Sequence, residues 1–226
     1  MTTIEDKALN GIRVKVAAMC ELVAGMYREG IGALAANNQE LAHRLVARDA
    51  QVDELELELE EMCLRFLALH APKAQELRFV VAVSRMIGDL ERIADHSKSI
   101  ARHVHEFYCV PILVRLPGFS GMAELTGTML DGAIEAFFKT DARKYVELVE
   151  KDRAVGEFQN TLNRQLVEII SREAESINGA VALLNVIRRL ERIADHAKNI
   201  ARLIPYIAEG ALMRAKGKTP NANNDN

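Results

Sequence analysis

A thirteen-residue segment that occurs twice constrains the fold of this chain more than any other feature. LERIADHSKSIAR, at residues 90–102, returns as LERIADHAKNIAR at residues 190–202, and 11 of the 13 positions are identical. Earlier segments align with a similar offset, since Asp49 and Asp152 are 103 positions apart in matching surroundings. A repeat of this length marks a duplicated structural unit. We therefore expect two similar domains in tandem.

Each copy reads as three helices. Residues 41–59 and 162–170 carry apolar side chains at helical spacing, and no stretch alternates apolar and polar side chains as a half-buried strand would. Pro72 is expected just inside the start of the third helix, where its missing N–H costs nothing. Short connections within each half imply antiparallel neighbours. The sequence predicts an all-α fold of two tandem antiparallel three-helix bundles, at residues 1–107 and 121–210.

The remaining segments are a connection and a tail. Residues 108–120 contain two prolines and a glycine between helical patterns, which predicts a linker. Residues 211–226 are polar and lack apolar periodicity, which predicts a disordered tail. No run of about 18 apolar residues exists, so we expect no membrane insertion. The first residues lack the apolar core of a secretory signal, so we expect a cytoplasmic protein.

Composition excludes several function classes. The formal net charge is -3, the pI is about 6.1 and aromatic residues make up 5% of the chain, which argues against nucleic-acid binding. The three cysteines, Cys20, Cys63 and Cys109, form no CxxC pair, and we expect them to be small buried apolar side chains. The chain has no P-loop, GxSxG or GxGxxG motif. We expect no catalytic centre.

Carboxylates within the repeated segment are the strongest candidates for chemistry. Glu91 and Asp95 are four residues apart and therefore share one edge of their helix, and Glu191 and Asp195 repeat the pair. A helical wheel places Arg92 on a different side, so we expect no cation of the same helix between the carboxylates. Such a pair repels itself unless a hard metal ion, or an Arg or Lys from a neighbouring helix, approaches.

The second helix of each bundle offers partners for these carboxylates. Asp49 and Asp53, also four apart, are expected to lie opposite the first pair and to complete a four-carboxylate metal site. In the second copy Asp152 is present, but Gly156 replaces the other aspartate and Arg188 adds a positive charge. We therefore expect the first site to bind metal more tightly. The alternative is that all these acids are solvated surface charges.

The repeated segment also carries histidines and basic residues. His96 and His196 follow the aspartates but point away from the carboxylate edge, and we interpret them as surface side chains or hydrogen-bond partners between elements. Arg92, Lys98 and Arg102 are expected to be mostly solvated. Arg92 and Arg102 are also candidates for binding an acidic partner surface.

The repeated segment resembles a known family signature. LERIADHSKSIA and LERIADHAKNIA are similar to the paired ERIGDHA-x-NIA signature of the PhoU family. APKAQELR at residues 71–78 resembles its P-x-A-x-DLR stretch, and DAQVDELE at residues 49–56 resembles its D-x-x-VD-x-LE helix. The likeness covers about residues 10–210. Ala94 and Ala194 depart from it, since the family usually has glycine there.

This resemblance implies a regulator of phosphate uptake that inhibits signalling when phosphate is plentiful. It implies contacts with the ATPase subunit of a phosphate ABC transporter and with a sensor histidine kinase, and we expect a homodimer. It also implies binding of Fe, Mn, Zn or Mg ions. The residues carried over as metal ligands are Glu91, Asp95, Glu191 and Asp195, with Asp49, Asp53 and Asp152 as co-ligands.

Three other functions remain open from the sequence. The carboxylates could serve a metalloenzyme, although an enzyme site needs an open coordination position and usually a nearby acid, base or histidine. The chain could be a bundle that only oligomerises. It could also be a paralogue that regulates a different transporter.

Overall fold

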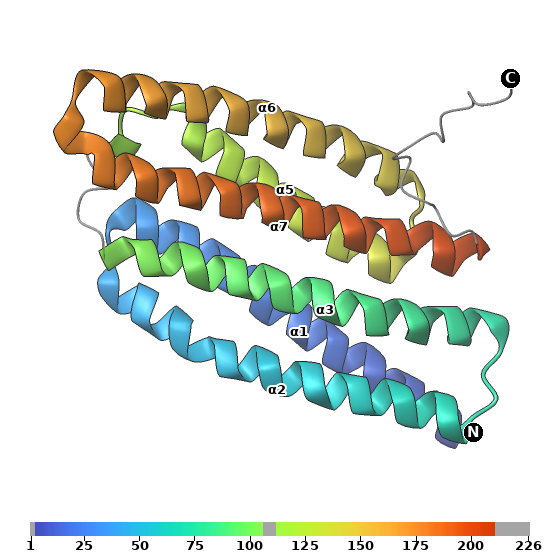
Figure 1. The fold of residues 1–226 in the computed structure, drawn as a ribbon. Coiled ribbons are helices and arrows are strands. Elements are labelled where there is room, and N and C mark those ends of the chain that lie inside the picture. Colours follow the sequence, from blue (N-terminus) through green and yellow to red (C-terminus); the bar gives the residue numbers. More distant parts are fainter. Residues whose placement is uncertain (1–2, 106–111, 211–226) are drawn as a thin grey trace, which may run out of the picture.

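The computed structural model describes residues 3–105 and 112–210, and both ranges are almost entirely helical (Figure 1). Within them there is no strand, which confirms the all-α prediction. The predicted linker lies partly, and the predicted tail wholly, outside the described residues. The long helices are α1 (Ile4–Ala36), α2 (Gln39–Leu69), α3 (Ala74–Arg102), α5 (Gly118–Lys139), α6 (Arg143–Arg172) and α7 (Ile177–Glu209), with single 3-10 turns at η1 (His103–His105) and η2 (Ala174–Ser176).

Helices α1, α2 and α3 pack on one another as one bundle, and α5, α6 and α7 pack as the other. The same turn chemistry connects the first two helices of each bundle. Asn37 ends α1 with a φ of 49°, and Thr140 ends α5 with a φ of 54°, so both adopt the left-handed conformation that stops a helix. The two tandem three-helix bundles predicted from the repeat are therefore confirmed.

The apolar stripes form the core of each bundle. In α3, the predicted core positions Val83, Ile87, Leu90, Ala94 and Ala101 are all buried. Such periodic burial explains why these long helices are stable, since most helical stability in proteins comes from tertiary packing of one face.

Two of the three cysteines are buried as predicted, and Cys109 lies outside the described residues. Burial raises the pKa of Cys20 to about 12 and that of Cys63 to about 11, so both thiols stay protonated. The prediction for Pro72 was wrong: α3 begins at Ala74, and Lys73 caps it by donating its backbone N–H to Glu76 at 2.9 Å.

The two bundles pack through α3 and α7, which lie side by side and antiparallel (Figure 1). Residues that come later in α3 contact residues that come earlier in α7. Arg78 Nε donates to the Ile207 carbonyl at 3.2 Å, whereas His96, further along α3, lies 3.3 Å from Arg189, further back on α7. Helices α1 and α5 meet on another side with a smaller contact. None of the described helices is both long and apolar enough to span a bilayer.

Candidate functional site

A lysine joins two aspartates in the first bundle. Lys98 Nζ donates hydrogen bonds to Asp49 on α2 and to Asp95 Oδ1 on its own helix, the latter at 2.7 Å. The lysine side chain is only 15% exposed, so water screens these contacts weakly. We call Asp49, Glu91, Asp95 and Lys98 the first carboxylate–lysine cluster.

The second bundle repeats this arrangement. Lys198 Nζ lies 2.6 Å from Asp152 Oδ2 and 2.7 Å from Asp195 Oδ1, and its side chain is also 15% exposed. We call Asp152, Glu191, Asp195 and Lys198 the second carboxylate–lysine cluster. Both copies of the repeat therefore position the same chemistry.

The expectation that no cation of the same helix approaches the carboxylates was wrong. Lys98 follows Asp95 by three residues, a spacing that places the two on neighbouring positions of one helix edge. Arg92 also contacts these carboxylates: its Nε lies 3.3 Å from Glu91 and its Nη1 lies 3.9 Å from Asp95. Arg92 nevertheless remains 62% exposed.

In the second cluster the cation near Glu191 is Arg192 rather than Arg188. Arg192 Nε lies 3.8 Å from the Glu191 carboxylate, and its Nη1 lies 4.0 Å from Asp195. Arg188 makes no ion pair with Glu191, and its side chain is exposed. Arg188 therefore does not neutralise Glu191 by direct contact.

The two carboxylates of the first motif differ in proton affinity. Partial burial, and then the charge of Asp95, raise the pKa of Glu91. Burial also acts to raise the pKa of Asp95, but the hydrogen bond and charge of Lys98 outweigh it and hold that pKa below its usual value. Glu191 and Asp195 are shifted in the same two directions for the same reasons. In each pair the glutamate therefore binds a proton more readily than the aspartate does.

Glu56 of α2 approaches the first cluster more closely than sequence reasoning anticipated. Burial, and then the charges of Glu60 and Asp53, raise its pKa, and the charge of Glu56 contributes to the raised pKa of Glu91. Asp53, the predicted co-ligand, is exposed. The signal was available in the spacing: Glu56 is seven residues from Asp49, two helical turns, and therefore points in nearly the same direction.

The donor chemistry of both clusters suits a hard cation, but an ammonium group already stands between the aspartates. Across residues 3–105 and 112–210, no three acidic, histidine or cysteine side chains converge closely enough to enclose a metal ion. In this arrangement Lys98 and Lys198 supply the positive charge that the carboxylates require. A metal ion could bind to these residues only if the lysine moved away.

The repeat histidines lie at the seam between the bundles. The rings of His96 and His196 are 5.7 Å apart, Arg189 Nη1 lies 3.3 Å from His96 Nδ1, and His196 Nδ1 lies 2.8 Å from Asp89 Oδ1. Burial, and then the charges of Arg189 and His196, lower the pKa of His96 to about 4. The interpretation of both histidines as hydrogen-bond partners between elements agrees with these contacts. Sequence reasoning missed Asp89 and Arg189, which occupy equivalent positions in the two copies with opposite charge.

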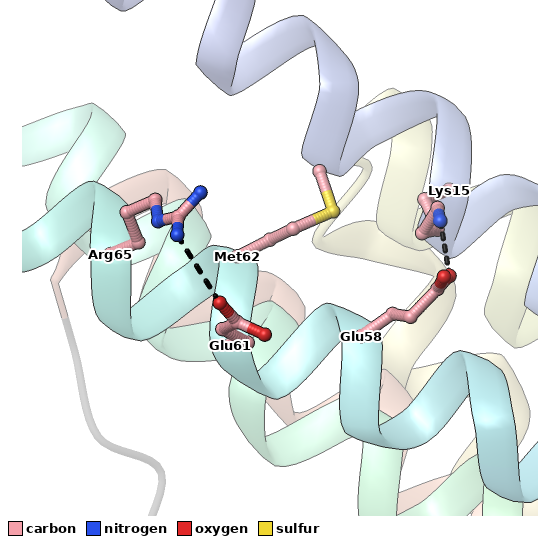
Figure 2. Close-up of a pocket in the computed structure, with 5 residues that line it drawn as sticks. All are labelled: Lys15, Glu58, Glu61, Met62 and Arg65. Atoms are coloured by element: carbon pink, nitrogen blue, oxygen red, sulfur yellow. Dashed lines mark hydrogen bonds and ion pairs between the residues drawn. The ribbon is translucent and has the colours of Figure 1, made fainter.

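A recess between α1 and α2 offers no comparable chemistry. Figure 2 shows Lys15 of α1 pointing to Glu58 of α2, with Met62 between the two helices. Arg65 pairs with Glu61 one turn away at 3.3 Å. Each charge that lines the recess is thus neutralised by a neighbour, and partly exposed pairs of this kind contribute little to stability or binding.

The opposite shifts at Glu91 and Asp95 can be tested by carboxyl titration. In metal-stripped protein, NMR of the side-chain carboxyl carbons should give a pKa above the ordinary value for Glu91 and below it for Asp95. Because the pKa of Glu91 is raised in the folded protein, the protein should lose stability as pH rises through that folded pKa. Asp95 contributes stability above its unfolded pKa, and that contribution is lost as pH falls through the folded value.

Substitution of the partner provides the control for this titration. Asp95→Asn removes the neighbouring charge, so the pKa of Glu91 should fall toward its ordinary value, while burial keeps it slightly raised. Asp89→Asn, on the same helix but at the seam, should leave Glu91 unchanged. A Glu91 that titrates normally in the unsubstituted protein would contradict the coupling.

Comparisons with known proteins agree with the repeat. The family model described as PhoU domain matches twice, at residues 16–104 and 119–204. The chain is 33% identical to the Zymomonas mobilis "Phosphate-specific transport system accessory protein PhoU homolog", over 94% of this chain and 91% of that one. It is 30% identical to the Escherichia coli "Phosphate-specific transport system accessory protein PhoU", over 92% and 87% respectively.

Two solved structures share the fold. The crystal structure of PhoU from Pseudomonas aeruginosa superposes with a TM-score of 0.82 at 28% identity, covering 91% of this chain and 99% of that one. The phosphate transport system regulatory protein PhoU from Streptococcus pneumoniae gives a TM-score of 0.82 at 26% identity, covering 93% and 99%.

Proposed function

This chain belongs to the PhoU family, and from that premise we propose that it is a non-enzymatic accessory protein that regulates phosphate transport and phosphate-responsive signalling. The observation that carries the proposal is the double match: both bundles correspond to PhoU domains. Relatives that match over nearly their whole length are named accessory proteins of phosphate-specific transport systems.

Regulation is proposed to act through protein contacts in the cytoplasm. The partners are the ATPase subunit of the phosphate transporter and a sensor histidine kinase, and contact with them keeps signalling low when phosphate is plentiful. Arg92 is 62% exposed and Arg102 is exposed as well, which supports a role for this edge of α3 in contacting an acidic surface. Arg92 contacts Glu91 and Asp95 of the first carboxylate–lysine cluster, so the state of that cluster can influence the contact with a partner.

Each carboxylate–lysine cluster is proposed to bind a divalent or trivalent metal ion in competition with its lysine. Asp49, Glu91 and Asp95, with Glu56 close by, would hold the ion in the first bundle. Asp152, Glu191 and Asp195 would hold it in the second. Carboxylate oxygens suit hard cations such as Mg or Mn and also bind Fe. Asp53 is exposed and would contribute only charge near the first site.

Capture of partners from cells tests the function and the surface together. Tagged protein from phosphate-replete cells should retain the transporter ATPase and the histidine kinase, identified by mass spectrometry. Arg92→Gln/Arg102→Glu should lower this capture by at least about fivefold, because charges at the rim of an interface steer association. Arg92 is changed to Gln and not to Glu, since a third acid beside Glu91 would disturb the cluster itself.

A matched pair of exposed arginines serves as the control. Arg44→Gln/Arg153→Glu makes the same change in charge on α2 and α6 and should leave capture unchanged. Circular dichroism should give equal helicity for all three proteins, because surface charges usually change stability by less than about 0.5 kcal/mol. Capture of neither partner by the unsubstituted protein would contradict the proposed function. Equal capture by both double variants would contradict only this surface.

A further inference from the structure

An open groove runs between α1 and α5, where the two bundles contact each other less than along α3 and α7. Two recesses of about 460 and 360 Å³ lie end to end along it. On α1 the lining extends from Ala17 to Ala35, which corresponds to about 27 Å of helix at 1.5 Å per residue. The groove is thus long enough to receive an approximately 18-residue helix.

The floor of the groove is apolar and rigidly built. Its side chains come from both bundles: Tyr27 and Ile31 from α1, Phe119 and Phe138 from α5. The Tyr27 hydroxyl donates to the Ala123 carbonyl at 2.5 Å and ties the two helices together. A Cβ at Gly127 would lie 3.0 Å from the Tyr27 ring, so only glycine leaves the ring in its present position without a shift.

The charged side chains at the rim of the groove that have no ion-pair partner within the described structure are acidic. Arg28 is paired with Asp131 at 3.0 Å, and Glu135 is paired with Lys139 at 2.5 Å. Glu21 and Glu124 also line the groove, and neither is paired with a cation among the residues that the structure describes. These two glutamates occupy equivalent positions of the repeat, 103 residues apart.

The Arg28–Asp131 pair crosses the groove where the two recesses meet, since both residues line both recesses. The two side chains are 58% and 57% exposed. Pairs this exposed contribute little net stability. A ligand can therefore separate them at small cost, and the separation leaves Asp131 as a third carboxylate for a basic ligand.

We propose that the α1–α5 groove is a docking site for a basic amphipathic helix of a partner protein. An apolar helix face matches the floor, and lysines or arginines on its flanks match Glu21, Glu124 and Asp131. A second copy of this chain fits less well, because an isologous contact would bring equally acidic rims together. An anionic lipid surface is disfavoured for the same reason. This inference goes beyond the phosphate-related function and does not depend on it.

Binding of a designed peptide to the full-length protein tests the site. The probe is an 18-residue Leu/Lys peptide with leucines at i, i+3, i+4 and i+7, compared by calorimetry with a Leu/Glu peptide of the same pattern and a scrambled Leu/Lys peptide. We expect the patterned Leu/Lys peptide to bind with micromolar affinity, at least about tenfold tighter than either control. Such a preference is expected if the groove selects both the shape and the charge of its ligand.

Substitutions that should weaken peptide binding, and one that should tighten it, test whether the peptide lies in the groove. Glu21→Lys/Glu124→Lys should weaken binding at least about tenfold, whereas Glu150→Lys/Glu175→Lys, an equal change at exposed sites elsewhere, should have no effect. Arg28→Ala should tighten binding about three- to tenfold, because it frees Asp131 and removes a like charge. Equal effects of the two double variants, weaker binding to Arg28→Ala, or no preference for the patterned basic peptide would overturn the proposal.

Discussion

Phe137→Ala should lower the free energy of unfolding by about 3–5 kcal/mol, the usual loss when a fully buried phenylalanine is truncated. Phe137 is 1% exposed and lies in α5 of the second bundle. Its ring centroid is 5.9 Å from that of Phe79 in α3 of the first bundle. The cavity would open between the bundles, where rigid helices on both sides cannot collapse into it.

The neighbouring Phe138 provides a matched control. Its ring lies edge-on to Phe137 at 5.6 Å between centroids, but it is only partly buried and lines the α1–α5 groove. Phe138→Ala should therefore cost less than about 2 kcal/mol, since water can fill the space that is left. Urea unfolding followed by circular dichroism measures both losses. Equal losses, or a loss below 1 kcal/mol for Phe137→Ala, would show that this contact does not hold the bundles together.

Repetition and periodicity made most of the fold predictable. The duplicated thirteen residues carry the apolar stripe from Leu90 and Leu190 onward, and equal stripes in equal surroundings produce equal bundles. The packing of α3 on α7 was not predicted. A stripe indicates that a face is buried, but it does not indicate whether a helix of the same bundle or of the other bundle covers it. The opposite charges of Asp89 and Arg189 were a sequence signal at that seam that was missed.

Sequence reasoning identified most of the acids that lie together in the candidate site, but it missed the cations and Glu56. Glu91 and Asp95 were identified because a spacing of four residues alone places them together. Lys98 was treated as solvated because lysine usually is. It is held instead by Asp49 of α2. A helical wheel describes one helix and does not show the register in which α2 is aligned along α3. The same register brings Glu56 rather than Asp53 near Glu91, since Glu56 lies seven residues beyond Asp49 and Glu91 seven before Lys98.

This register also changes which residues account for the predicted difference between the two proposed metal sites. By the same antiparallel alignment, the residue equivalent to Glu56 in α6 is Gln159, 103 positions later. The second cluster therefore has one acid fewer for a reason other than Gly156. The affinity of a site for a divalent cation rises with the negative charge around it. A tighter first site stays a prediction, with Glu56 in place of Asp53 as its source.

Lys98→Met should raise the affinity of the first cluster for Mn²⁺ by at least about tenfold, because it removes a competing charge at 2.7 Å from a ligand oxygen. Methionine is similar in length and flexible, so the space remains filled without a charge. The substitution leaves Asp49 and Asp95 without their shared partner, and their repulsion in the metal-free state adds to the gain on binding. Lys198→Met should act in the same way, with a smaller final affinity.

Calorimetric titration of chelator-treated protein with Mn²⁺ measures these changes. Lys151→Met is the control, since Lys151 pairs with Glu147 at 2.8 Å on α6 and lies outside both clusters. In protein that retains both lysines, Glu91→Ala/Asp95→Ala should abolish the tighter phase of Mn²⁺ binding, and Glu191→Ala/Asp195→Ala should abolish the weaker one. If Lys98→Met binds Mn²⁺ no better than Lys151→Met, the lysine does not compete with metal. If neither lysine variant takes up metal at all, the clusters are ion pairs that stabilise the bundles, and the proposed metal sites are wrong.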